Sequence, residues 1–237
     1  MYTLHFKLNL KKQNMKLSKL LLIAPIALAS SYVTAQTHVD NTGKINMYSK
    51  KAESESAQGS QYFIDKFNPA HIGDLSDVSL VRYNAYKDEM EIKVNDAINV
   101  LQPIEKQAIK LINGTATYEY ITYTDKEGVE NQHFLIIISE NPNLKIFKRE
   151  RITLIPEQHP AGGYQKYKAP QYKKLDPEYY IQMNGGTVTA MSTRKSDIIA
   201  LVPAKQSEVK DFIKTNKIST DEDADLKKLG AYLNTLL

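Results

Sequence analysis

Tyrosines and lysines alternate along one short stretch, and these residues are the best suited to bind a ligand. Aromatic rings stack on sugars or bases, and ammonium groups between them hold anions. An extended segment of this kind can equally wrap its own domain, with the rings buried and the ammonium groups in water. The pattern favours wrapping, but it is also the one place where the sequence predicts a ligand site, for an acidic glycan or another anionic partner. The residues are Tyr164, Lys166, Tyr167, Lys168, Tyr172, Lys173 and Lys174.

Scattered histidines are the next groups that could do chemistry. His38, His71, His133 and His159 do not share the spacing of metal ligands. Because a zinc site needs several close ligands, the spacing favours unrelated surface or loop histidines. The sequence therefore predicts no metal site.

Three carboxylates cluster at one expected hairpin tip: Asp88, Glu89 and Glu91. Glu89 and Glu91 share a strand face, and paired carboxylates flanking a cleft can hydrolyse glycosides. Carboxylates beside a turn are more typical of a solvated edge that discourages strand aggregation, which is the interpretation we favour. No Gly-x-Ser-x-Gly elbow, phosphate-binding loop or dinucleotide-binding glycine pattern is present. The sequence predicts no catalytic residue and no cofactor.

The amino end has the order of a secretory signal peptide. Met15 opens a basic stretch with Lys16 and Lys19, an apolar run covers residues 20–29, and small residues lead to Ala35. The apolar run is shorter than the roughly 20 residues that a membrane-spanning helix needs. We therefore expect Met15 to be the initiator, cleavage after Ala35, and no membrane span after that cleavage.

The charge balance disfavours nucleic acid as a partner. The chain has 31 basic and 27 acidic residues, but five of the lysines lie in residues 1–35. Without them 26 basic residues face 27 acidic ones, and a nucleic-acid binder needs a domain-wide basic excess. The absence of cysteine excludes disulfides, zinc-cysteine sites and thiol catalysis.

Period-two patterning predicts an antiparallel β-rich region. Met90, Ile92 and Val94 alternate with charged residues, which is typical of a half-buried strand. Asn113-Gly114 between β-prone runs predicts a tight hairpin with both residues at positive φ. The apolar run 134–138 predicts a strand buried on both faces. About seven or eight such strands imply a sandwich or a barrel-like meander.

The carboxyl end is predicted to be a hairpin followed by two or three helices, which makes the fold class α+β. Thr220 and Asp223 fit a capping box at the start of the last helix. A leucine stripe along that helix predicts docking on the domain's own core rather than a coiled coil. The expected organisation is a leader over 1–35, a mobile polar tether over 36–59, the β-rich region over 60–155, an irregular Tyr/Lys/Pro-rich connection over 156–177, and the hairpin and helices over 178–237.

Three stretches carry a resemblance to uncharacterised exported proteins of Gram-negative bacteria. They are residues 81–91, residues 179–182, and the tail from Lys195 to Lys217. The resemblance lies in the order of strands and helices. It implies an envelope or secreted location and supplies no activity.

These observations favour a non-enzymatic binding or structural protein of the bacterial envelope, in the periplasm or outside the cell. Its partner would be an envelope protein or glycan. The alternative is a hydrolase of envelope or extracellular polymers. A pocket holding two acids, or a histidine with an acid, would favour the hydrolase.

Overall fold

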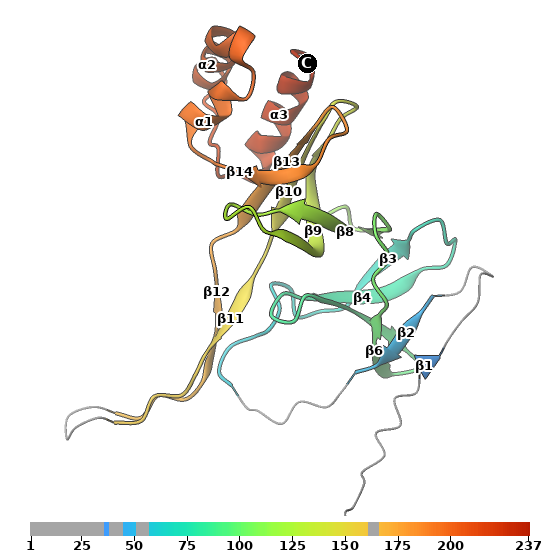
Figure 1. Cartoon of the computed structure of the whole chain (residues 1–237). Helices are drawn as coiled ribbons and strands as arrows, with labels where there is room; N and C mark the ends of the chain where they lie inside the picture. The colour runs from blue at the N-terminus through green and yellow to red at the C-terminus, as the bar shows by residue number, and fades with distance from the viewer. Residues whose placement is uncertain (1–35, 38–44, 51–56, 161–165) are drawn as a thin grey trace, which may run out of the picture. The chain divides into compact units, whose positions relative to one another are not determined.

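The computed structural model describes residues 36–37, 45–50, 57–160 and 166–237 (Figure 1). The expected leader, with Met15 and the cleavage site after Ala35, lies outside these residues. Within the described ranges, none of the helices combines the length and apolar character needed to cross a membrane.

The amino-terminal half forms an antiparallel sheet of short strands. Its order is β1-β2-β6-β5-β4-β3-β7-β8, and neighbouring strands are joined by hydrogen bonds. The strands are β1 (Gln36–Thr37), β2 (Met47–Ser49), β3 (Asn68–Ile72), β4 (Ser79–Asn84), β5 (Glu89–Val94), β6 (Ala97–Leu101), β7 (Ala108–Leu111) and β8 (Thr117–Thr124).

Strand β8 also belongs to a closed five-strand barrel. The chain continues as a meander through β9 (Glu130–Glu140), β10 (Leu144–Arg149), β13 (Glu178–Met183) and β14 (Val188–Met191). Strand β14 closes the ring by pairing parallel to β8. The β-rich character and the helical carboxyl end are confirmed. Strand β9 pairs with both β8 and β10, which confirms the prediction that residues 134–138 lie in a central strand.

The barrel interior is filled by side chains that recur every second residue along the strands. Each of them is at most 5 % exposed, and burial of such a side chain contributes roughly 1.5–3 kcal/mol. They come from all five strands: Ile121, Tyr123, Leu135, Phe147, Tyr180 and Val188.

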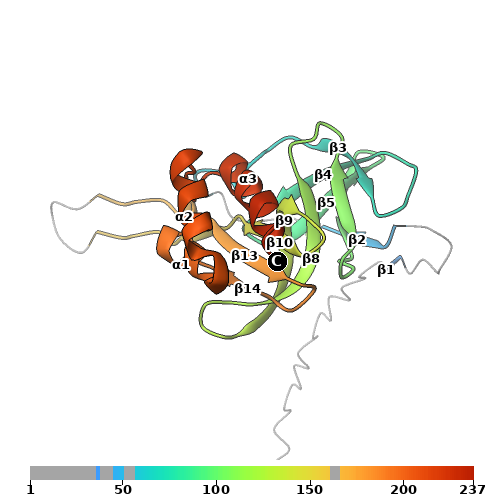
Figure 2. The same cartoon turned by 90° about the horizontal axis from the view of Figure 1, so that it is seen from above.

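Helices cover one outer flank of this barrel. They are α1 (Lys195–Ala200), a 3-10 turn (Pro203–Lys205), α2 (Gln206–Thr215) and α3 (Asp223–Asn234), and Figure 2 looks down on them. Leu226, Leu229 and Leu233 of α3 are at most 1 % exposed and pack with Leu144 and Ile146 of β10. The predicted docking of the leucine stripe is therefore confirmed.

Close approach of α3 to the sheet depends on Gly230. A Cβ atom at this position would clash with the Ser139 side chain and approach Ile146 Cδ1 to 3.2 Å. The predicted capping box is wrong, because α3 begins at Asp223 after Glu222 and no side chain caps it. The Thr220 hydroxyl instead donates to the Thr193 carbonyl at 2.6 Å, and Asp223 pairs with Lys148.

Parts of the expected tether are ordered by pairing. Strand β2 pairs with β6 over Met47 to Ser49, and Gln58 exchanges backbone hydrogen bonds of 2.8 Å with Pro170 and Tyr172. Described residues within 36–59 thus belong to the fold, and the prediction of a tether is wrong for them. Residues 38–44 and 51–56 lie outside the described part.

The expected irregular connection over 156–177 is also corrected. Strand β11 (Ile152–Ile155) pairs with β12 (Gln171–Lys174), and Gln158 pairs with Lys168 further along. We call this hairpin the arm; it leads away from β10 and β13 in Figure 1. The described chain forms nine strands from β3 to β11 where seven or eight were expected.

The Asn113-Gly114 hairpin is present, but its turn differs from the expected one. Of its two central residues only Gly114 has a positive φ, of 72°. The Asn113 side chain accepts hydrogen bonds from the Thr115 amide at 3.1 Å and hydroxyl at 2.7 Å. This local bonding replaces the need for a second left-handed residue.

Candidate functional site

The acidic hairpin tip is not a solvated edge, because Glu91 is fully buried. Its carboxylate lies 2.6 Å from Lys50 Nζ and 2.6 Å from an Arg82 guanidinium nitrogen, and it accepts a 2.8 Å bond from the Tyr62 hydroxyl. The Asn84 amide is a further donor at 3.4 Å. We call these five residues the Glu91 cluster. The alternation expected for Met90, Ile92 and Val94 also fails at the end of β5, since Val94 is 36 % exposed.

The Glu91 cluster holds its carboxylate ionised. Burial by itself raises the pKa of Glu91, but hydrogen bonds from Lys50, Arg82 and Tyr62 outweigh burial and leave the pKa below its usual value. The Arg82 guanidinium also lies 3.8 Å from the Tyr62 ring centroid. A carboxylate that is satisfied on every side ties the amino-terminal segment to β4 and β5, and it is poorly placed for catalysis.

Two of the predicted ligand residues pack against the protein. Gln61 Nε2 donates to the Tyr172 hydroxyl at 2.7 Å, and the Tyr172 ring centroid lies 5.0 Å from that of Tyr86. The Lys174 ammonium lies 4.6 Å from the Phe63 ring centroid. These contacts agree with wrapping at this end of the arm.

Of the other predicted residues, Lys173 lies between Tyr172 and Lys174 in β12, and the rest lie further along the arm. Lys166, Tyr167, Lys168 and Lys173 are exposed. The Tyr167 hydroxyl donates to Glu157 at 2.9 Å, and its ring centroid lies 5.5 Å from that of His159. Tyr164 lies outside the described residues. The structure therefore does not gather the predicted set on one surface, and ligand binding there stays a prediction.

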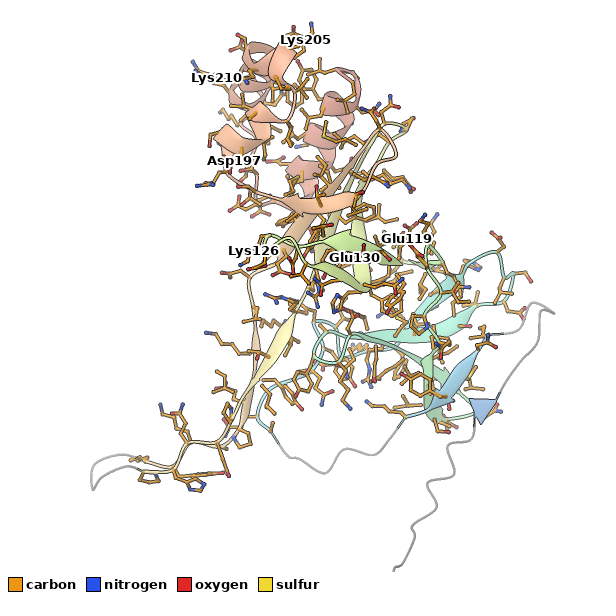
Figure 3. The ribbon with its side chains drawn as sticks, in the orientation of Figure 1. Glu119, Lys126, Glu130, Asp197, Lys205 and Lys210 are labelled. Atoms are coloured by element: carbon orange, nitrogen blue, oxygen red, sulfur yellow. The ribbon has the colours of Figure 1, made fainter. Side chains whose placement is uncertain are left out.

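A broad groove opens instead at one end of the barrel, and we call it the mouth groove. It is formed by the turn between β8 and β9, the end of β10, the start of β13, and the end of β14. Lys126, labelled in Figure 3, belongs to that turn. The residues that matter for its chemistry are Thr124, Asp125, Lys126, Glu127, Asn131, His133, Arg149, Arg151, Glu178, Tyr180, Thr189 and Thr193.

Strand periodicity explains why polar side chains gather at this end. His133 comes two residues before the core residue Leu135, Arg149 two after Phe147, and Glu178 two before Tyr180. Alternate residues on a strand share a face. The interior face of the barrel thus changes from apolar to polar where its strands reach the mouth groove.

His133 is neutral at physiological pH. Burial, together with the positive charges of Arg149 and Arg151, lowers the pKa of His133 to about 4, although Glu178 acts in the opposite direction. Its Nδ1 atom lies 2.8 Å from the Tyr123 hydroxyl. A neutral imidazole can exchange hydrogen bonds with a ligand without adding charge.

Arg149 and Arg151 share one carboxylate. Arg151 lies 2.8 Å and Arg149 3.6 Å from oxygens of Glu178, which also accepts a 3.0 Å bond from the Tyr180 hydroxyl. The Nε atoms of both arginines are buried, and neither has a hydrogen-bond partner among the described residues. A buried donor without an acceptor costs about 1–3 kcal/mol, so the mouth groove retains unused donor capacity.

Asp88 lies in a smaller hollow beside the mouth groove, and the two share His133, Arg149 and Arg151. Burial raises the pKa of Asp88 to about 6, although a 2.6 Å bond from the Tyr83 hydroxyl and a 3.2 Å bond from the Phe134 amide lower it. Asp88 therefore changes charge near physiological pH.

In the sequence, His133 and Asp88 stand out separately, whereas no motif identifies Arg149, Arg151 or Glu178. The only local signal was Arg149-Glu150-Arg151, two like charges one residue apart at a strand end. Among the described residues, no group of three or more histidine or acidic side chains could hold a metal ion. The arrangement suits recognition of a polar ligand that carries hydrogen-bond acceptors.

Comparison with known proteins adds no relative. No protein-family model matches the chain, and no match is found among curated protein sequences or among solved structures.

Proposed function

We propose that this chain is an exported, non-enzymatic binding protein of the bacterial envelope, and that the mouth groove is its binding site. The leader-like residues 1–35 support export. Barrel mouths are common places for ligand sites, where a few polar groups fix the ligand.

One observation carries the proposal: the buried Nε donors of Arg149 and Arg151 have no acceptor among the described residues. Nearly all buried polar groups of folded proteins are hydrogen-bonded, so two exceptions in one groove need an explanation. A ligand that brings an acceptor into the groove, with a small rotation of either guanidinium, supplies the missing bond.

The experiment that tests the proposal is site-specific photocrosslinking. A photoreactive amino acid replaces Lys126 at the mouth groove or, as the matched control, Lys210 on α2; both lysines are labelled in Figure 3. Incubation of the full chain with envelope fractions should give adducts from position 126 and none from position 210. Equal adducts from both positions, or none from position 126, would contradict the proposal.

The alternative is a hydrolase, and one observation favours it: His133 and Glu178 line the same groove. A histidine whose pKa is about 4 is a weak general base at neutral pH, which is why we prefer binding. If the chain releases new reducing ends from envelope polysaccharide, and His133→Ala abolishes the release, the hydrolase replaces the binding protein.

A further inference from the structure

Arg149 and Arg151 line two neighbouring cavities, and each cavity holds a carboxylate. In the mouth groove, Glu178 lies directly opposite Arg149 in the pairing of β10 with β13, and their side chains approach to 3.6 Å. In the smaller hollow, Asp88 lies among the lining residues together with both arginines. The two carboxylates therefore compete for the same positive charges.

Asp88 is fixed in the hollow by its own turn and by strand β9. Its φ of 57° lies in the left-handed region, which aspartate and asparagine adopt more readily than other non-glycine residues. Its Oδ1 atom accepts hydrogen bonds from the Tyr83 hydroxyl at 2.6 Å and from the Phe134 amide at 3.2 Å. A protonated carboxyl group keeps acceptor capacity for such bonds. A change in the charge of Asp88 therefore acts on the groups around it.

The tyrosines and the histidine that face Asp88 keep their charge where Asp88 changes its own. Burial raises the pKa values of Tyr83, Tyr120 and Tyr123 above the usual value for tyrosine. Burial and the nearby arginines lower the pKa of His133 to about 4. These four groups are therefore largely neutral between about pH 5 and pH 7, where Asp88 titrates.

The remaining groups around Asp88 act on it through charge. Tyr86, Lys87 and Glu89 belong to the same turn, and the Glu89 carboxylate raises the pKa of Asp88. The Arg149 guanidinium acts in the opposite direction, and arginine keeps its charge throughout this range. Interaction between two charges is mutual, so ionised Asp88 also attracts Arg149.

We infer that the mouth groove is coupled to a proton: protonation of Asp88 removes the charge that competes for Arg149 and Arg151, and thereby strengthens binding of a ligand that brings an acceptor to them. This inference rests on the proposed function and adds regulation of the same site. It requires of the ligand only an acceptor, which is what the unused Nε donors lack. Affinity should be highest below about pH 6 and should fall as the pH rises through this value.

The test is photocrosslinking from position 126 of the full chain at about pH 5 and about pH 7.5, over a series of envelope-fraction concentrations. The concentration that gives half of the maximal adduct should be about fivefold or more lower at the lower pH, as expected for typical coupling between two sites. Asp88→Asn should crosslink at low concentration at both pH values. The matched control Asp211→Asn, at an exposed position of α2, should keep the pH dependence of wild type.

Comparison among these chains isolates Asp88, because any effect of pH on the envelope partner is common to all of them. Asparagine suits the left-handed φ at this position, and thermal melting confirms that the variant is folded. Tyr83→Phe is the second variant. It removes a hydrogen bond that lowers the pKa of Asp88, so the midpoint of the pH dependence should move to higher pH.

Heteronuclear NMR of the full chain without envelope fractions gives an independent measurement. The Nε–H resonances of Arg149 and Arg151 should shift with a midpoint near pH 6 in wild type, and this shift should be absent in Asp88→Asn. Resonances that do not shift in wild type, or crosslinking whose pH dependence survives Asp88→Asn, would overturn the inference.

Two failures can be told apart. If position 126 gives adducts whose yield does not depend on Asp88, the proton coupling is wrong while the binding site stands. If position 126 gives no adduct at either pH, the proposed function fails, and the coupling inferred from it fails with it.

Discussion

The Glu91 cluster and the mouth groove both contain partly buried charged groups, and they differ in how completely the hydrogen bonds of these groups are made. In the Glu91 cluster, one carboxylate accepts hydrogen bonds from four side chains: Lys50, Arg82, Tyr62 and Asn84. In the mouth groove, two arginines share one carboxylate, and their Nε donors have no described partner.

This difference separates a structural role from a binding role more clearly than residue type does. Both clusters contain arginine, a carboxylate and tyrosine, so composition alone would assign them the same purpose. A satisfied cluster gains nothing from a ligand, whereas a cluster with unmet donors does. Four predictions test whether the contrast is real.

The largest effect is expected at Glu91. Glu91→Ala leaves Lys50 and Arg82 without their carboxylate, and breaking a buried charge pair from one side costs about 3–5 kcal/mol. Urea denaturation should show this loss in the free energy of unfolding. The matched change Glu178→Ala in the mouth groove should cost about 1 kcal/mol or less, because this pair is partly exposed. Equal losses would remove the contrast between the clusters.

The next effect is a pH dependence at Asp88. Its pKa rises from 3.8 to about 6 on folding, so the folded state favours the protonated form. Stability from this group is complete below pH 4 and is lost as pH rises through 6, by at most about 3 kcal/mol. Asp88→Asn mimics the protonated form and should flatten the profile between pH 4 and 7, as measured by thermal melting. Glu91, whose lowered pKa acts in the opposite direction, keeps its contribution above about pH 4.5 and loses it as the pH falls further. A profile that is unchanged in the variant would show that Asp88 does not titrate there.

A smaller effect distinguishes the two ends of the arm. Tyr172→Phe removes the hydroxyl that accepts from Gln61 and should cost about 0.5–1.5 kcal/mol. Tyr167→Phe removes only an exposed bond to Glu157 and should leave the free energy of unfolding unchanged. Chemical denaturation of both variants measures the difference. A larger loss of unfolding free energy in Tyr167→Phe than in Tyr172→Phe would show that the arm is anchored by its far end.

A small effect on stability is also expected in the mouth groove itself. Arg151→Gln removes a partly exposed ion pair together with an unmet donor, so the two contributions oppose each other. The free energy of unfolding should change by less than about 1 kcal/mol. A loss comparable to that of Glu91→Ala would mean that the mouth groove is a structural cluster after all.

Local patterns predicted the elements that depend on local physics. The unbroken apolar run of β9 identifies a strand, and the period of the leucine stripe identifies the helix α3. Residues 134–136 of the run are buried and residues 137–138 are half-buried, while Leu226, Leu229 and Leu233 are buried. The burial of Glu91 could not be predicted, because Lys50 precedes it by 41 residues. Alternation assigned Glu91 to the solvent face, and only the fold reveals that another segment covers that face.

The mouth groove was missed for a related reason. His133, Arg149 and Glu178 lie on three strands, and each is unremarkable in its own sequence context. They meet because β10 pairs with both β9 and β13, which places Arg149 directly opposite Glu178. Residues 150–177 separate β10 from β13, and no local pattern in either strand identifies the other as its partner.

The parallel pair β8 and β14, which closes the barrel, has a consequence for how the protein folds. A meander with an odd number of strands must close with one parallel pair, and here it has two matched positions, Val188 with Tyr123 and Thr189 with Thr124. The antiparallel pair β8 and β9 has seven. Residues 125–187 separate the closing strands. The chain therefore loses the conformational entropy of a long loop before the few contacts of the β14–β8 pairing, which we call the seam, offset that loss. We expect the seam to form after the hairpins in refolding and to open first in hydrogen exchange, which makes barrel closure the slow step in assembling the mouth groove.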